Sequence, residues 1–159
     1  MFTTAFPVKG INEAALAHAH LSSVIKSGDP KGANNCNLEI TISHGWVIDS
    51  LSFKTVDKNG KSEYSDKFGG EGGDSDLIKF DWPKEYLTSI SGTHHTFEKQ
   101  HVIESLCFHT NRTKYGTFGR TKGSPFDLPL KDRVSVIGFH GRACNYINAI
   151  GVYQKGPSS

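Results

Sequence analysis

The chain carries one seven-residue pattern three times, and this internal repeat constrains its fold more than any other feature. The sequence VIDSLSF at residues 47–53 returns as VIESLCF at residues 102–108, and a weaker copy, YINAIGV, occupies residues 146–152. In each copy the second, fifth and seventh positions are apolar, and Asp, Glu or Asn follows the first Ile. The three copies predict three equivalent structural units.

Glycine-containing segments repeat together with the seven-residue pattern. The first copy is followed by FGGEGG at residues 68–73 and the second by FGRTKG at residues 118–123. The third copy stands near the end of the chain, and the matching segment, SGDPKG, lies near the start at residues 27–32. The repeat is therefore circular, and we expect the C-terminal strand to pair with the N-terminal segment.

Alternating apolar and polar residues predict that the units consist of β-strands. The alternation is clear at residues 38–42, 51–53 and 134–136, and Gly, Asn and Pro mark frequent turns between such stretches. The sequence predicts an all-β domain of about twelve short strands in three sheets around one core. Residues 12–21 are the one candidate for a short helix, capped by Asn12. The segment 1–23 as a whole fits an added strand, a short helix or a disordered arm.

Charge and composition argue against several classes of partner. Eighteen Lys and Arg face sixteen Asp and Glu, and the net charge of +2 is spread along the chain, which argues against a nucleic-acid partner. No apolar stretch approaches the ~20 residues of a membrane span, so we expect no membrane partner. Three cysteines form an odd number, which favours a reducing compartment. With no signal-peptide pattern at the start, the expected location is cytoplasmic or nucleocytoplasmic.

Motifs of enzymes and metal sites are not found in the sequence. The histidine pairs His18/His20 and His94/His95 lack the spacing and partners of a zinc site. There is no Gly-x-Ser-x-Gly elbow and no phosphate-binding loop. We therefore expect a protein that is not an enzyme and needs no cofactor or metal.

Several motifs in the same order resemble those of the jacalin-related lectins. They are FGGEGG at 68–73, ISGTH at 90–94, KYG at 114–116 with FG at 118–119, VIGFHGR at 136–142 and NAIGVY at 148–153. The resemblance implies a β-prism I fold of three four-stranded Greek-key sheets with pseudo-threefold symmetry. It also implies a single jacalin-like lectin domain at 24–154, after an N-terminal extension (1–23) and before a C-terminal tail (155–159), in a plant protein.

The family resemblance implies sugar binding at a hairpin of the form Gly-x-x-x-Asp beside a glycine-rich loop. A carboxylate at such a tip accepts charge-assisted hydrogen bonds from two sugar hydroxyls. Glycine lets the sugar ring approach the main chain, and an aromatic side chain covers the apolar face of the ring. An unbroken chain before Gly28 resembles the mannose/glucose-preferring type, so the expected ligands are mannose- or glucose-containing glycans.

The first repeat unit matches this pattern without departure. We call this candidate the second site, because it resembles the second sugar site that some mannose-binding relatives carry. By resemblance, Asp49 accepts from the sugar, while the N–H groups of Trp46, Val47 and Gly73 donate and Trp46 covers the ring. The residues of the second site are Gly45, Trp46, Val47, Asp49, Gly72 and Gly73. The alternative is that the glycines serve turns and Asp49 caps a hairpin.

The last hairpin corresponds to the family's primary site, but it departs from the pattern. Cys144 replaces the glycine and Asn148 replaces the aspartate, and an amide lacks the charge assistance of a carboxylate. The candidate residues of this primary-type site are Gly32, His94, Cys144, Asn145, Tyr146 and Asn148. The alternative is a decayed hairpin in which Asn148 satisfies its own turn.

The remaining repeat unit, at residues 100–104 and 119–123, is expected to be silent. Gln100 replaces the glycine, and Glu104 is one methylene longer than Asp. Because single sites of this kind bind weakly, a homodimer or tetramer is expected to supply avidity. The alternative function is a jacalin-fold protein-interaction module with degenerate sugar sites.

Overall fold

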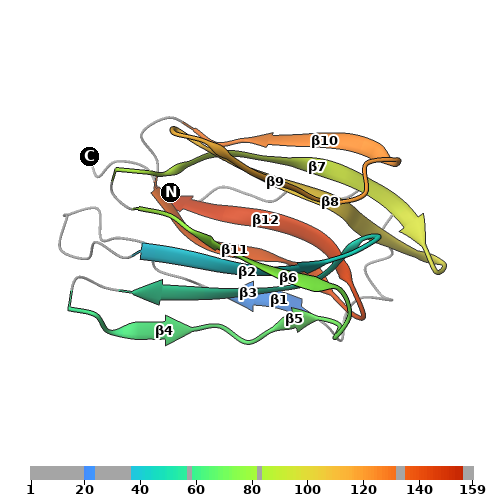
Figure 1. The fold of residues 1–159 in the computed structure, drawn as a ribbon, viewed down its shortest axis with the longest axis horizontal. Helices are drawn as coiled ribbons and strands as arrows, with labels where there is room; N and C mark the ends of the chain where they lie inside the picture. The colour runs from blue at the N-terminus through green and yellow to red at the C-terminus, as the bar shows by residue number, and fades with distance from the viewer. Residues whose placement is uncertain (1–19, 24–36, 57–58, 82–83, 132–134, 156–159) are drawn as a thin grey trace.

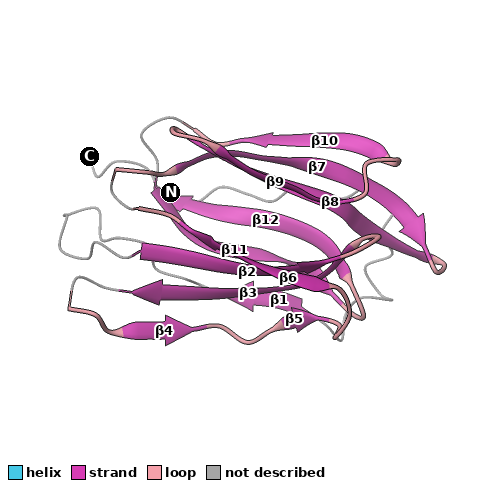
Figure 2. Cartoon of the chain, viewed as in Figure 1, coloured by secondary structure: helices cyan, strands magenta, loops and turns pink. Residues whose placement is uncertain are grey.

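The computed structural model describes residues 20–23, 37–56, 59–81, 84–131 and 135–155, and its elements in these ranges are twelve β-strands without a helix (Figures 1 and 2). The first sheet has the order β4(Ser62–Tyr64)-β3(Ile48–Val56)-β2(Asn37–His44)-β6(Asp74–Lys79), with β5(Phe68–Gly69) also on β3. The second has the order β10(Ser124–Pro129)-β7(Leu87–Phe97)-β8(Gln100–Thr110)-β9(Lys114–Gly119). The third has the order β1(His20–Ser23)-β11(Ser135–Ala143)-β12(Ile147–Lys155).

The three antiparallel sheets confirm the all-β prediction, although their described parts hold five, four and three strands. The N-terminal segment joins the third sheet, as the circular repeat predicted, but its partner is β11 rather than the terminal strand β12. The predicted helix at 12–21 is wrong for its two described residues, His20 and Leu21, which lie in β1. Its other residues lie outside the described ranges.

The three copies of the repeat form the inner strands β3, β8 and β12, and their apolar positions build the core. Ile48, Leu51 and Phe53 are fully or almost fully buried in β3, and the equivalent residues of β8 and β12 are buried in the same way. The Phe53 ring of the first sheet stacks on the Phe139 ring of the third at 4.5 Å. The core therefore draws on all three sheets, which explains why the apolar positions repeat three times.

A β-bulge at the same position of each sheet explains the spacing of the repeat. The second and fifth positions are three residues apart, so they cannot face the same side of a regular strand. On β3, the pairings His44↔Ile48 and Ser43↔Ser50 leave Asp49 as the extra residue. The equivalent shifts leave Glu104 extra on β8 and Asn148 extra on β12. The bulge thus keeps the apolar residues in the core and re-aims one polar side chain in each unit.

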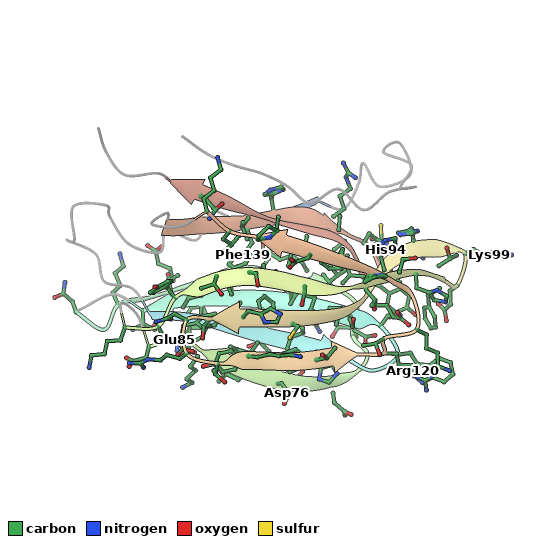
Figure 3. All side chains as sticks on the ribbon, turned by 90° about the horizontal axis from the view of Figure 1, so that it is seen from above. Asp76, Glu85, His94, Lys99, Arg120 and Phe139 are labelled. Carbon is green, nitrogen blue, oxygen red and sulfur yellow. The ribbon has the colours of Figure 1, made fainter. Side chains whose placement is uncertain are left out.

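The bulges lie at one end of the molecule, near the turns that join the paired strands. The β2–β3, β7–β8 and β11–β12 hairpin turns and the β5–β6 and β9–β10 loops gather at the right-hand end in Figure 1. At the opposite end the buried Glu85 carboxylate accepts hydrogen bonds from the Tyr115 and Thr110 hydroxyls (Figure 3). In the described ranges no helix has the length and apolarity to cross a bilayer.

Candidate functional site

The carboxylate of Asp49 faces the glycine-rich loop that joins β5 to β6. A Cβ atom at Gly72 would lie 2.9 Å from Asp49 Oδ1, and one at Gly73 would lie 2.7 Å from Asp49 Oδ2. The positive φ of +85° at Gly73 also favours glycine. The structure therefore brings Asp49, Gly72 and Gly73 together, as the family resemblance implied, and we call this group of residues the Asp49 notch.

The Asp49 carboxylate keeps its hydrogen-bonding capacity in this structure. Among the described residues, no N–H or hydroxyl group donates a hydrogen bond to it; Gly70 N donates to the Asp49 main-chain oxygen instead, at 2.9 Å. Burial raises the pKa of Asp49 above the usual carboxyl value, and the electrostatic influence of nearby His44 partly offsets the effect. His44 is itself held by Asp76, with Nε2 2.7 Å from Oδ2. The notch thus contains a recessed acceptor without a protein donor.

The β2–β3 turn supplies the other predicted residues of the second site. Gly45 N donates to Val47 O at 3.1 Å, and in the described chain no main-chain oxygen accepts from Trp46 N or Val47 N. Of the two, Trp46 is exposed, so its N–H group is the better candidate donor to a ligand, whereas Val47 is only 2% exposed. Asp49 is only 9% exposed, whereas Trp46 is 62% exposed. One of its faces lies under the Arg120 guanidinium, 3.8 Å from the ring centroid, so only the remainder of the indole can cover a sugar.

The equivalent carboxylate of the second sheet is already occupied by the protein. Glu104 is buried and its oxygens accept hydrogen bonds from Thr93 Oγ1 at 2.8 Å, Gly123 N at 2.6 Å and Lys122 N at 3.2 Å. Both carboxylates lie equally close to their loop glycine, 2.7 Å from a Cβ atom placed at Gly73 or at Gly123, but in the described chain only Glu104 accepts from loop N–H groups. This geometry agrees with the expectation that this unit is silent.

Asn148, the corresponding residue of the third sheet, is 1% exposed and points toward the second sheet. Its Nδ2 donates to the main-chain oxygen of His101 at 2.8 Å, and its Oδ1 finds no partner in the described chain. Asn148 therefore contacts β8 rather than its own turn. Cys144 N donates to Tyr146 O at 3.0 Å, and the Cys144 thiol is half-buried. Gly32 belongs to segment 24–36, which lies outside the described residues.

His94 is connected to the primary-type site indirectly, through His101 on β8. Its Nδ1 lies 2.9 Å from His101 Nε2, and the His101 main chain holds Asn148. Burial lowers the pKa of His101, and the nearby His94 and His95 rings lower it further. His94 is thus connected to Asn148 only through His101.

The last hairpin packs against the Asp49 notch, a contact that sequence reasoning missed. A Cβ atom at Gly70 would lie 2.2 Å from Asn145 O, so this hairpin touches the loop of the first sheet. The Tyr146 hydroxyl donates to Glu98 Oε2 at 2.9 Å, and this bond, with burial and the charges of Glu98 and Asp49, raises the pKa of Tyr146. Asn145, the neighbour of Tyr146 in this turn, is the residue that touches the loop of the notch.

Phe97, at the end of β7, connects the two aromatic residues of these turns. Its ring centroid lies 5.4 Å from that of Tyr146 and 6.4 Å from that of Trp46. These residues come from three sheets, so no local sequence pattern marks them as neighbours.

Among the described residues, no cluster of His, Cys, Asp and Glu is arranged to hold a metal ion.

The raised pKa of Asp49 predicts opposite effects of acid on ligand binding and on stability. Ligand hydroxyls need the ionised carboxylate, so affinity should fall at a higher pH than for an ordinary carboxyl group. Since the pKa is higher in the folded state, Asp49 contributes stability when protonated and loses that contribution as the pH rises through its folded pKa. Titrating affinity and Tm from about pH 7 to about pH 4 tests both effects. Affinity that stays constant until an ordinary carboxyl would protonate contradicts this prediction.

Comparison with known proteins identifies relatives over most of the chain. The model of the jacalin-like lectin domain matches residues 25–153. Jacalin-related lectin 3 of Arabidopsis thaliana is 48% identical over 120 residues, which cover 74% of this chain and 20% of that protein. A mannose/glucose-specific lectin of Parkia platycephala is 45% identical over 130 residues, which cover 77% of this chain and 28% of that protein. The chain thus spans less than a third of the length of these two relatives.

A solved structure is similar over nearly the full length of both chains. It is that of a mannose-binding jacalin-related lectin from Ananas comosus, with a TM-score of 0.72 and 28% sequence identity. The similarity covers 99% of this chain and 98% of that one.

Proposed function

The chain belongs to the family of jacalin-like lectins, carbohydrate-binding proteins that are not enzymes, and we propose that it binds mannose- or glucose-type glycans at the Asp49 notch. Its three sheets are the β-prism of this family. The sugar class is suggested by the mannose/glucose-specific lectin and the mannose-binding lectin to which the chain is similar. The position of the binding site is suggested by the physical difference between the three bulges.

The difference between Asp49 and Glu104 carries the proposal. Both carboxylates sit on equivalent bulges beside a glycine-containing loop, but Glu104 accepts three hydrogen bonds from the protein. None of the described groups donates to the Asp49 carboxylate. A sugar with two adjacent hydroxyls can supply the missing donors, and the side-chain-free loop leaves room for its ring.

Binding of simple glycosides tests this proposal. Because recognition rests on a few directional hydrogen bonds, each single site should be weak, with a Kd of about 1 mM or somewhat below. Inverting one recognised hydroxyl should cost roughly tenfold in affinity. Calorimetry with methyl α-mannoside, methyl α-glucoside and methyl β-galactoside is therefore expected to show binding of the first two and about tenfold weaker binding of the third. Equal binding of all three, or a galactoside preference, contradicts the assigned sugar class.

A protein-interaction module is the second candidate, and the state of the other two units favours it. Glu104 already accepts hydrogen bonds from the protein, and Asn148 is buried against the second sheet. A folded chain that binds no sugar on a broad glycan array would support this alternative.

For a lectin with such weak sites we also propose a homodimer or tetramer, which sedimentation analysis can detect.

A further inference from the structure

The β9–β10 loop of the silent unit packs against the turn of the Asp49 notch. The His44 and Phe118 ring centroids are 5.2 Å apart, and the Arg120 guanidinium lies 3.8 Å from the centroid of the Trp46 ring. These two contacts place the end of β9 beside the end of β2. Arg120 therefore lies at the rim of a site whose carboxylate belongs to another sheet.

The Arg120 side chain is oriented, but its charge is not paired. Its guanidinium lies over the Trp46 ring as in a cation–π contact, and the hydrogen bonds from Lys122 N and Gly123 N to Glu104 help to hold the loop. Among the described residues, no carboxylate lies within ion-pair distance of it. A guanidinium that stacks on a ring still presents N–H donors at its edge.

The charges around Arg120 favour an anionic ligand group. Lys99 and Lys122 are exposed, and within the described ranges neither has an ion-pair partner. Of the nearby acidic groups, Asp76 pairs with His44, Glu98 accepts from the Tyr146 hydroxyl, Asp49 is buried, and Asp74 is exposed beside His44 without an ion pair among the described residues. Figure 3 shows Lys99 and Arg120 at the same end of the molecule. Arg120, Lys99 and Lys122 thus offer cationic groups at this end that no ion pair of the described ranges occupies.

We propose that Arg120 forms a subsite for an acidic substituent, a carboxylate or a sulfate, on the sugar residue next to the one held in the Asp49 notch. The planar guanidinium matches the paired oxygens of either group. The inference rests on the proposed function, because the notch must hold the first sugar. It assigns specificity to the β9–β10 loop of the second sheet, whose own carboxylate, Glu104, already accepts hydrogen bonds from the protein.

The test compares three disaccharides of identical linkage: a neutral mannose disaccharide, its analogue with a uronic acid as the second ring, and its analogue with a sulfate on that ring. At about 20 mM salt, where charges are weakly screened, at least one acidic form should bind about tenfold more tightly than the neutral one. The preference should shrink at about 500 mM salt. Whether the uronic acid or the sulfate gains more identifies the substituent.

Variants of Arg120 separate a ligand contact from mere packing on Trp46. Arg120→Gln should lose the acidic preference and keep the affinity for the neutral disaccharide, while Arg120→Lys should retain part of the preference. The inference is overturned if the wild type binds acidic and neutral forms equally, or if Arg120→Gln keeps the preference. If neutral binding depends on Asp49 but acidic forms gain nothing, the proposed function stands and this inference fails. If no saccharide binds, both fail.

Discussion

Replacing Asp49 with Asn should weaken sugar binding by roughly 100-fold or more. The ionised carboxylate accepts two hydrogen bonds from the ligand, and each charge-assisted bond contributes about 1.5–3 kcal/mol. An amide has only one acceptor oxygen and no charge, so at least one of these bonds is lost outright. For a site with weak starting affinity, such a loss takes binding below the range of calorimetry.

The stability of the Asp49→Asn variant should not fall with its affinity. Burial raises the pKa of Asp49, which means that its charge opposes folding at neutral pH. The variant should therefore unfold at the same temperature as the wild type or slightly above it. Asn148→Ala is the control at the equivalent bulge: it should keep sugar binding although it removes the Nδ2 hydrogen bond to His101. If Asn148→Ala loses binding while Asp49→Asn keeps it, the ligand occupies the primary-type site.

Replacing Gly73 with Ala should impair both binding and folding. The new Cβ would lie 2.7 Å from Asp49 Oδ2 and 2.8 Å from both His44 N and His44 O, and a backbone cannot move aside as a flexible side chain can. The positive φ of +85° adds strain of about 1 kcal/mol. We expect a total loss of unfolding free energy of about 2–4 kcal/mol and no measurable sugar binding, because the methyl group fills the notch.

Gly60 offers a matched control for the backbone strain at Gly73. Its φ of +81° is nearly the same, but nothing lies within 4 Å of the position of a Cβ. Gly60→Ala should therefore lose only about 1 kcal/mol of stability and bind sugar normally. Denaturant unfolding and calorimetry of the two variants isolate the effect of the occupied space. If Gly73→Ala behaves like Gly60→Ala in both measurements, the notch is not where the sugar binds.

The repeat predicts the core, because the buried positions follow from local sequence, whereas the family resemblance predicts that Asp49 lies beside its glycine loop. Ile48, Leu51 and Phe53 mark the buried side of an inner strand, and the extra residue between the first two is the bulge that re-aims Asp49. A wrong prediction occurred where the sequence signal was weak. His20 and Leu21 end an alanine-rich segment with helical propensity, but pairing with β11 places them in a strand.

Contacts between sheets could not be predicted from the sequence. Arg120 lies over Trp46, and Gly70 touches Asn145, although the partners in each pair belong to different repeat units. Only the closed arrangement of three sheets brings them together. The sequence also does not show whether a carboxylate accepts hydrogen bonds from the protein. Asp49 and Glu104 lie equally close to their loop glycines, and only the orientation of the loop N–H groups distinguishes them.

The location of the bound sugar tests the central claim most directly. Amide resonances of the isotopically labelled protein can be followed while methyl α-mannoside is added. The structure predicts that the largest shifts arise at Gly72 and Gly73 and at the main-chain and indole N–H groups of Trp46, with smaller effects at Asn145 and Tyr146 beside the notch. Shifts confined to residues 144–148, with Gly72 and Gly73 unchanged, would show that the bulge at Asp49 is not the sugar-binding one.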